Sequence, residues 1–217
     1  MRKMRKDHEK GIDPKWLTWA QRIQGIAQSG LQYTANPYDE ERYRELSRIA
    51  SEIMEEKTIS KPGEVRMVFD QQSGYATPKL DIRGVVFKED KILLVRELLD
   101  KGLWTLPGGW VDINEPPSAA VEREVREEAG KIVKAQKLLG MYDTNQHGHP
   151  PIPFHTYKLF FLCIVLGETE IAPHETAEPT YFAEDEIPEL STGRVTPQEI
   201  TRMFEHMRNP TLPTDFD

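Results

Sequence analysis

The pattern of hydrophobic and polar positions changes near residue 60. Before that point, apolar residues recur at three- and four-residue steps, which predicts amphipathic helices. One helix is expected from Asp13 to Gly30 and a second from Asp39 to Lys57, so that the two form a hairpin. Two helices cannot bury a core alone. The N-terminal domain, residues 1–65, is therefore predicted to act as a dimerisation element or as a substrate lid.

Beyond residue 60 the apolar residues form short runs of strand length. The runs KLDIRGVVF (79–87) and KILLVREL (91–98) are separated by polar residues and are predicted to be neighbouring antiparallel strands. The runs YKLFFLCIVLG (157–167) and PTYFA (179–183) predict two more strands, because branched and aromatic residues favour sheets.

Helices are expected at only two places in this second part of the chain. One opens around Ser118 and ends at Gly130, and the other begins at Thr196, where Glu199 has the spacing of a capping box. Few helices among several strands, without regular alternation, predict an α+β fold. We expect an α/β/α sandwich around a mixed sheet in residues 66–217, preceded by the small helical domain.

Composition narrows the function classes. The 217 residues include 36 Asp and Glu against 28 Lys and Arg, for a net charge of -8, which argues against binding nucleic acid through a broad basic face. The single cysteine, Cys163, excludes a disulfide within one chain. Because no apolar run reaches the eighteen or so residues of a membrane span, we expect a cytoplasmic protein that does not contact a membrane.

The stretch REVREEAG (123–130) gathers its acids on one side of the predicted helix. At about 100° per residue, Glu124, Glu127 and Glu128 share a sector roughly a hundred degrees wide, next to an apolar sector. Like charges at this spacing repel each other, so the cluster calls for a cation. Oxygen ligands favour Mg²⁺, with Mn²⁺ as a possible substitute.

The residues just upstream supply a flexible loop. In LPGGW (106–110), Gly108 and Gly109 allow a sharp turn and a close backbone approach to a ligand. A carbonyl presented by this loop could therefore reach the same ion.

Together, loop and helix resemble the signature of the Nudix hydrolases. That signature reads Gly, five residues, Glu, seven residues, Arg-Glu, an apolar residue, any residue, Glu-Glu, any residue, Gly. The matching positions are Gly109, Glu115, Arg123, Glu124, Val125, Glu127, Glu128 and Gly130. Lys131 stands where the pattern has an apolar residue, a departure that concerns packing at the helix end and leaves every metal-facing position intact.

The resemblance implies a Nudix-type sandwich that hydrolyses a nucleoside diphosphate linked to another moiety. Water would attack phosphorus with the help of Mg²⁺, held by the Gly108 carbonyl, Glu124, Glu127 and Glu128. Arg123 would pair with Glu115 or a neighbouring acid and so orient the metal ligands.

The general base is open between two residues. Glu127 could serve from the helix, but in this family the base often comes from a later loop, where Glu178 is an equal candidate and Glu175 a weaker one.

Three residues are candidate substrate contacts. Arg83 and Arg96 lie on predicted strands near the signature loop and could meet the diphosphate, and Trp104 could stack on a base. The HGHP segment (147–150) offers no third ligand at a zinc spacing and is expected to be a flexible loop.

The order of the helical hairpin, the strands and the signature resembles a bacterial subfamily with an N-terminal helical extension. That subfamily includes a CDP-choline pyrophosphatase, so the first expected reaction is CDP-choline to CMP and phosphocholine. ADP-ribose is the alternative substrate. A noncatalytic Nudix ligand sensor and an enzyme acting on RNA 5′ ends or as an exonuclease are less favoured, because the acids are intact and the chain is acidic. A homodimer is expected.

Overall fold

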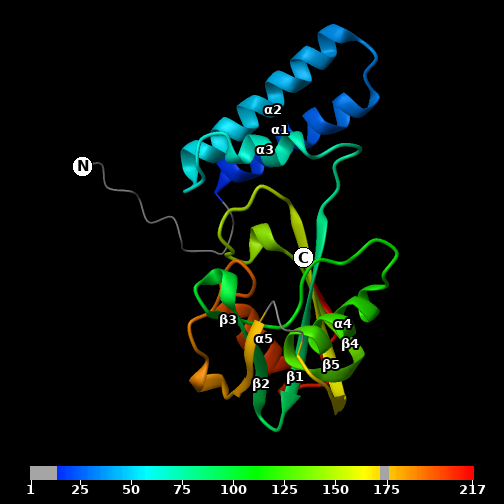
Figure 1. The fold of residues 1–217 in the computed structure, drawn as a ribbon, viewed down its shortest axis with the longest axis vertical. Coiled ribbons are helices and arrows are strands. Elements are labelled where there is room, and N and C mark those ends of the chain that lie inside the picture. The colour runs from blue at the N-terminus through cyan, green and yellow to red at the C-terminus, as the bar shows by residue number, and fades with distance from the viewer. Residues whose placement is uncertain (1–13, 172–175) are drawn as a thin grey trace, which may run out of the picture. The chain divides into compact units, whose positions relative to one another are not determined.

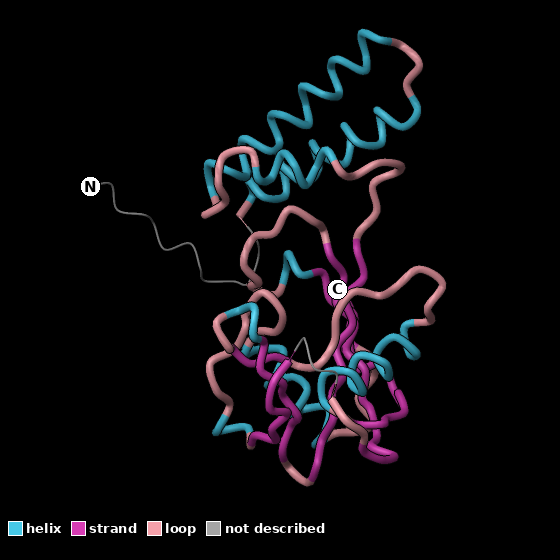
Figure 2. Tube along the Cα trace, viewed as in Figure 1, coloured by secondary structure: helices cyan, strands magenta, loops and turns pink. Residues whose placement is uncertain are grey.

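The computed structural model describes residues 14–171 and 176–217, except for the side chains of residues 176–178. It consists of two compact units. The first contains the chain up to Lys79 together with Pro150–His155, and the second contains Leu80–His149 and Thr156–Asp217. Figure 2 shows helices in the first unit and the strands, with further helices, in the second. No helix within the described ranges is long and apolar enough to cross a membrane.

The described part of the first unit contains three helices: α1 (Lys15–Tyr33), α2 (Pro37–Lys57) and α3 (Glu64–Asp70). The first two confirm the predicted hairpin. α2 begins two residues earlier than expected, because the Asn36 side chain accepts a hydrogen bond from the Tyr38 amide at 2.9 Å and so caps the helix. α3 was not predicted, since seven residues are too few to show a helical period.

α3 lies beside α2 (Figure 1), and its buried side chains complete the core of the first unit. All three helices contribute to the cluster, which consists of Leu17, Ala20, Ala50, Met54, Val65 and Phe69. The predicted domain limit at residue 65 therefore falls inside a helix whose buried side chains, Val65 and Phe69, belong to the first unit.

The second unit is built on a mixed sheet with the strand order β3-β2-β1-β5-β4-β7, and β6 also pairs with β2. Most strand pairs are antiparallel, and β4 with β7 is parallel. The predicted neighbours β1 and β2 are confirmed. The elements are β1 (Lys79–Lys88), β2 (Lys91–Glu97), η1 (Leu98–Asp100), β3 (Leu103–Thr105), α4 (Pro117–Ala129), β4 (Lys131–Asp143), η2 (Thr144–Gln146), β5 (Thr156–Glu168), β6 (Thr176–Phe182), η3 (Glu184–Glu186), α5 (Pro197–Arg208) and β7 (Asp215–Phe216).

β4 is the principal strand that the sequence pattern did not reveal. It pairs with β5 along its whole length, but its register shifts at three places. Each irregularity breaks the two-residue alternation by which a strand is recognised. Three lysines, Lys131, Lys134 and Lys137, also make the segment look solvated.

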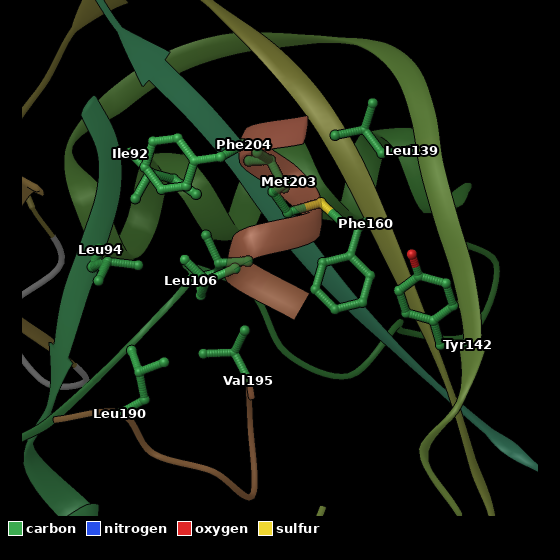
Figure 3. Close-up of a cluster of buried hydrophobic side chains, with 12 residues drawn as sticks. Ile92, Leu94, Leu106, Leu139, Tyr142, Phe160, Leu190, Val195, Met203 and Phe204 are labelled. Atoms are coloured by element: carbon green, nitrogen blue, oxygen red, sulfur yellow. The ribbon is translucent and has the colours of Figure 1, made fainter. Parts of the chain in front are cut away.

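Helices cover the two faces of the sheet and give the predicted α/β/α sandwich. On β1 the neighbouring residues Val85 and Val86 point into different clusters, as strand geometry requires. Val86 packs with Val121 and Val125 of α4. Val85 belongs to the cluster of α5, in which Phe204 lies near Ile92 and Met203 near Phe160 (Figure 3).

Two helix ends follow the sequence prediction. Thr196 and Glu199 form a complete capping box at the start of α5. α4 ends at Ala129, and Gly130 follows with a φ of 61°, a left-handed conformation that glycine adopts at low cost. These ends fix α4, which carries the acidic residues, between a proline-rich entry and β4.

Candidate active site

The loop before α4 is bonded to β1 on both sides of Gly108. The Pro107 carbonyl accepts a hydrogen bond from the Gly84 amide at 2.7 Å, and the Gly109 carbonyl accepts one from the Ile82 amide at 2.9 Å. Gly108 has a φ of 146°, and a Cβ added there would lie 1.9 Å from the Ile82 carbonyl oxygen. Its own carbonyl has no hydrogen-bond partner among the described residues. The Gly108 carbonyl is thus available to a ligand, whereas the carbonyls on either side of it, of Pro107 and Gly109, are hydrogen-bonded to β1.

Two carboxylates of α4 meet this loop. Glu128 Oε2 accepts a hydrogen bond from the Gly108 amide at 2.9 Å. Glu124 lies so close to Gly109 that a Cβ on that glycine would stand 3.2 Å from Glu124 Oε1. Both acids are buried, whereas Glu127 is partly exposed. The signature acids therefore line up along one flank of the helix, beside the glycines.

Arg123 joins three carboxylates. Its Nε and Nη2 each donate to Glu115 at 2.9 Å, in a two-pronged pair. Its Nη1 donates to Glu124 at 2.8 Å and to Glu127 at 3.1 Å. The predicted pairing of Arg123 with Glu115 is present, and the same guanidinium orients two of the expected metal ligands. The hydrogen bond from Arg123 lowers the pKa of Glu115.

Burial dominates the electrostatics of the two inner acids. Burial raises the pKa of Glu128 to about 8, against the opposing effects of the Arg83 charge and the Gly108 amide. Burial also raises the pKa of Glu124, with Arg123 opposing it. Removing two carboxylates from water without enough positive charge is unfavourable, and a divalent cation would offset that cost.

The donor set fits a hard divalent cation. Carboxylate oxygens and a backbone carbonyl are the ligands that Mg²⁺ and Mn²⁺ prefer. No three His, Cys, Asp or Glu side chains within the described ranges converge tightly enough to hold an ion as they stand. Arg123 accounts for this, since it draws Glu124 and Glu127 to itself.

Arg83, predicted to meet the diphosphate, lies behind the loop. It is 4% exposed, and its guanidinium makes a two-pronged pair with Asp81 at 2.8 and 2.7 Å. Its Nη1 donates to the Leu106 carbonyl, just before the loop, at 3.2 Å. The buried Lys158 also approaches Asp81, at 3.4 Å. In this arrangement Arg83 supports the loop from within the protein.

Arg96 and Trp104 face each other in the register of β2 and β3. Arg96 Nε donates to the Gly102 carbonyl at 3.1 Å, and the side chain is exposed. The Trp104 ring packs edge-on against Phe182 with a centroid distance of 4.9 Å. Stacking of Trp104 on a base stays a prediction.

The two later candidates for the general base fall largely outside the described residues. Glu175 lies outside them altogether, as does the side chain of Glu178. The backbone of Glu178 belongs to β6, one residue after Ala177, which pairs with Arg96 of β2. Glu178 therefore sits on β6, the strand that pairs with β2, and its role as a general base stays a prediction.

Two charged residues near the site were not identified from the sequence. Glu97 ends β2 and is buried, and its charge adds to the effects that raise the pKa of Glu128. Glu97 Oε2 lies 3.1 Å from Nε of Arg194. Glu97 could have been found from the sequence, because it is a single acid at the end of an apolar strand that precedes the LPGG loop. Arg194 could not, because no sequence spacing links it to the Nudix signature.

The HGHP segment differs from the expected flexible loop. His149 is buried, with Nδ1 2.8 Å from the Thr192 carbonyl and Nε2 3.0 Å from Glu199 Oε1. These contacts attach the segment to the start of α5.

Comparison with known proteins agrees with this geometry. Residues 77–204 match the family model described as the NUDIX domain, and residues 14–69 match one described as a UDP-X-like, N-terminal oligomerisation domain. A Bacillus subtilis (strain 168) protein named "Putative ADP-ribose pyrophosphatase YjhB" is 41% identical over 95% of this chain and 99% of its own length. The ADP-ribose pyrophosphatase of Methanocaldococcus jannaschii is 33% identical over 54% of this chain and 69% of its own length.

Solved structures give the same result. The crystal structure of a UDP-X diphosphatase, 30% identical, covers 94% of this chain and 98% of that one with a TM-score of 0.59. An ADP-ribose pyrophosphatase from Streptococcus suis, 36% identical, covers 65% of this chain and all of that one with a TM-score of 0.56.

The chain belongs to the Nudix hydrolases and is a pyrophosphatase of that family. Within it, the match to the N-terminal oligomerisation domain assigns the chain to the members that carry a helical extension before the catalytic domain. The resemblance inferred from the signature is thereby confirmed.

Proposed function

We propose that this protein hydrolyses, with Mg²⁺, the diphosphate bond of a nucleoside diphosphate linked to another moiety. The products would be a nucleoside monophosphate and the phosphorylated moiety. The observation that carries the proposal is the meeting of two buried carboxylates, Glu124 and Glu128, with a glycine loop whose Gly108 carbonyl is unengaged within the described residues.

The metal would be held by Glu124, Glu127, Glu128 and the Gly108 carbonyl. When bound, Mg²⁺ or Mn²⁺ neutralises charge on the phosphate oxygens and makes a nearby water more acidic. Room for it requires Nη1 of Arg123 to release Glu124 and Glu127. The two-pronged pair with Glu115 uses the other edge of the guanidinium and can persist, so Arg123 keeps its orientation.

For the proton of the attacking water, we propose Glu127 or Glu178. Glu127 is the most exposed of the three helix acids and can turn toward substrate. Glu178 is favoured by its place on β6 next to β2. Replacing each by Gln separates them, because the base mutation lowers kcat about a hundredfold or more and flattens the acidic side of the pH profile.

ADP-ribose is the first substrate to test and CDP-choline the second. Relatives that match this chain are named for ADP-ribose, and one of them is aligned over nearly its full length. CDP-choline follows from the resemblance to the subfamily with a helical extension. The assay presents both, with a UDP-linked compound, NADH, diadenosine polyphosphates and 5′-triphosphorylated RNA, to the protein with Mg²⁺.

The panel also decides between the enzyme and the other proposals. Turnover of RNA alone would favour action on RNA ends, although the chain is acidic overall. Binding without turnover of any compound would favour a ligand sensor. A Glu128→Gln variant serves as the control. If this variant hydrolyses a compound as fast as the parent protein does, a contaminant is responsible.

We further propose a homodimer formed through α1. Trp19, Ile26 and Tyr33 are spaced seven residues apart, so they share one face of the helix, and they are 57%, 58% and 73% exposed. The match of residues 14–69 to an oligomerisation domain favours a second copy as the partner of this face. Sedimentation at micromolar concentration tests it, since Ile26→Glu should shift a dimer to a monomer.

A further inference from the structure

Trp110 is an exposed aromatic residue directly beside the catalytic loop. It follows Gly109 in the chain, and the residue is 49% exposed. Among the described residues, no ring packs on it and no acceptor binds its indole N–H. Trp104, by contrast, packs edge-on against Phe182. An indole whose face and N–H are both open is suited to receive a planar ligand.

The backbone around Trp110 is fixed, so the ring is presented from a defined position. The Ile82 amide of β1 donates to the Gly109 carbonyl at 2.9 Å, and the Val111 amide donates to the Leu80 carbonyl at 3.2 Å. These two bonds hold the chain on both sides of Trp110. Because a tryptophan side chain has only two rotatable bonds and its backbone is already ordered, binding a ligand here costs little conformational entropy.

The ring lies on the face of the sheet opposite to α4. Val111, the next residue, packs in the α4 cluster together with Ile82. Successive side chains of an extended chain point to opposite faces, so Trp110 points to the other face. Asp81, which forms an antiparallel bridge with Trp110, shares that face, because residues directly opposite each other in such a bridge point the same way.

Trp110 is also close to the place expected for the diphosphate. It lies two positions after Gly108, whose amide binds Glu128, and one after Gly109, where a Cβ would lie 3.2 Å from Glu124 Oε1. Two residues of chain span at most about 7 Å. A substrate whose diphosphate meets these acids therefore has one of its two end groups within reach of the indole.

The charges on the face that carries the ring favour a neutral ligand over a cation. Arg83 binds Asp81 through two nitrogens, and Nζ of the buried Lys158 lies 3.4 Å from Asp81 Oδ1, so two cations share one acid. The carboxylate of Asp112 lies 3.9 Å from Arg123. A quaternary ammonium such as that of choline would meet an excess of buried positive charge, whereas a nucleobase stacks without needing a negative partner.

We propose that Trp110 stacks on the nucleobase of the substrate. The inference rests on the proposed function and adds a specificity-determining residue to it: the diphosphate is held at the acids and the glycine loop, and the indole binds the nucleoside end. Because every base has a π-face, the ring should accept different bases with similar affinity. The competing role is packing alone, in which the ring only shields the loop from water.

The test compares Trp110→Phe, Trp110→Leu and the control Phe216→Ala by calorimetric binding of AMP in the presence of Mg²⁺. Phenylalanine keeps an aromatic face, so AMP affinity should fall less than threefold. Leucine keeps apolar bulk without that face, so AMP affinity should fall about tenfold. KM for the hydrolysed substrate should follow the AMP affinity, while kcat changes less than threefold.

Two controls separate stacking from other effects. Ribose 5-phosphate and phosphocholine carry no base, so they should bind the parent and all variants equally. Phe216 is exposed on β7, three places from β1 in the strand order, and its removal should change none of these constants.

Several results would overturn the proposal. Stacking is rejected if Trp110→Leu binds AMP as tightly as the parent, if phenylalanine and leucine cause equal losses, or if ribose 5-phosphate or phosphocholine is weakened as much as AMP. Absence of AMP binding to the unmodified protein would reject it as well. If leucine disturbs thermal unfolding, Trp110→Ala replaces it with the same expected loss. If the unmodified protein hydrolyses nothing in the panel, the proposed function fails, and the AMP titrations still decide the role of Trp110.

Discussion

Two neighbouring glycines allow the stability of the catalytic loop to be separated from its chemistry. Gly108 and Gly109 stand side by side, but a Cβ meets different obstacles at each. At Gly108 it would lie 1.9 Å from the Ile82 carbonyl oxygen, and the φ of 146° is one that side chains rarely adopt. At Gly109 the nearest atom is Glu124 Oε1 at 3.2 Å, the end of a side chain that can move.

The expected magnitudes follow from these obstacles. Gly108→Ala must shift backbone, and the conformation alone costs about 1–3 kcal/mol, so we expect the free energy of unfolding to fall by roughly 3 kcal/mol or more. Gly109→Ala displaces only the Glu124 carboxylate. Its stability should change by less than about 0.5 kcal/mol. Because Glu124 is an expected metal ligand, its displacement should weaken Mg²⁺ binding about tenfold, equivalent to about 1.4 kcal/mol.

The assay is thermal unfolding with and without Mg²⁺, followed by the Mg²⁺ dependence of hydrolysis. Gly193→Ala is the matched control, since a Cβ there meets nothing within 4 Å. The control should match the parent in both measurements. A Gly108→Ala protein as stable and active as the parent, or a Gly109→Ala protein with unchanged Mg²⁺ affinity, would contradict these expectations.

Three further predictions concern other parts of the chain. Arg123→Lys should lower kcat about tenfold or more at saturating Mg²⁺, because lysine cannot keep the two-pronged hold on Glu115; equal kcat values would contradict this. The hydrogen bond from Arg202 comes first among the effects that lower the pKa of Asp215, so its stabilisation is present above pH 4 and lost below it. Asp215→Asn should therefore unfold about 1 kcal/mol more easily at pH 7 in urea titrations, and the difference should shrink progressively as the pH falls below about 4, toward the lowered pKa of folded Asp215; a difference that stays constant from pH 7 to pH 2 would reject this account. Trp19→Glu should lower the sedimentation coefficient to that of a monomer without changing kcat. If the helical domain were instead a substrate lid, the substitution would change kcat.

The elements predicted from the sequence are those with an uninterrupted period. α1, α2, α4, α5 and β1, β2, β5 and β6 each carry enough regular apolar positions to be recognised. β4 was missed because its register irregularities break the alternation, and β7 because two residues have no period. α3 was missed for its length, although its residues Val65 and Phe69 close the core of the first unit. The period of apolar residues reveals which face of a single helix or strand is buried. It does not reveal structure that depends on pairing or packing with another element.

The site shows the same division. Arg123, Glu124, Glu127 and Glu128 come from one helix, so their mutual arrangement follows from helix geometry. Glu97 and Arg194 pair with each other from segments 97 residues apart in sequence, a contact that depends on the fold of the whole second unit. Arg83 lay on the expected strand, but whether it faced substrate or Asp81 depended on which side of β1 was covered, a property of the whole fold.

The position of Arg123 next to Glu124 has a physical reason beyond the pairing with Glu115. A guanidinium at this position reaches the next residue and the one four ahead, so it can draw both Glu124 and Glu127 to a single nitrogen. That nitrogen shares its donors between two acids, and each receives less stabilisation than Glu115 obtains from two nitrogens. A divalent ion offers both acids a stronger partner. The arginine thus keeps the two acids together in this structure, and its hold on Glu115 would fix its place if a bound metal were to draw Glu124 and Glu127 away from it.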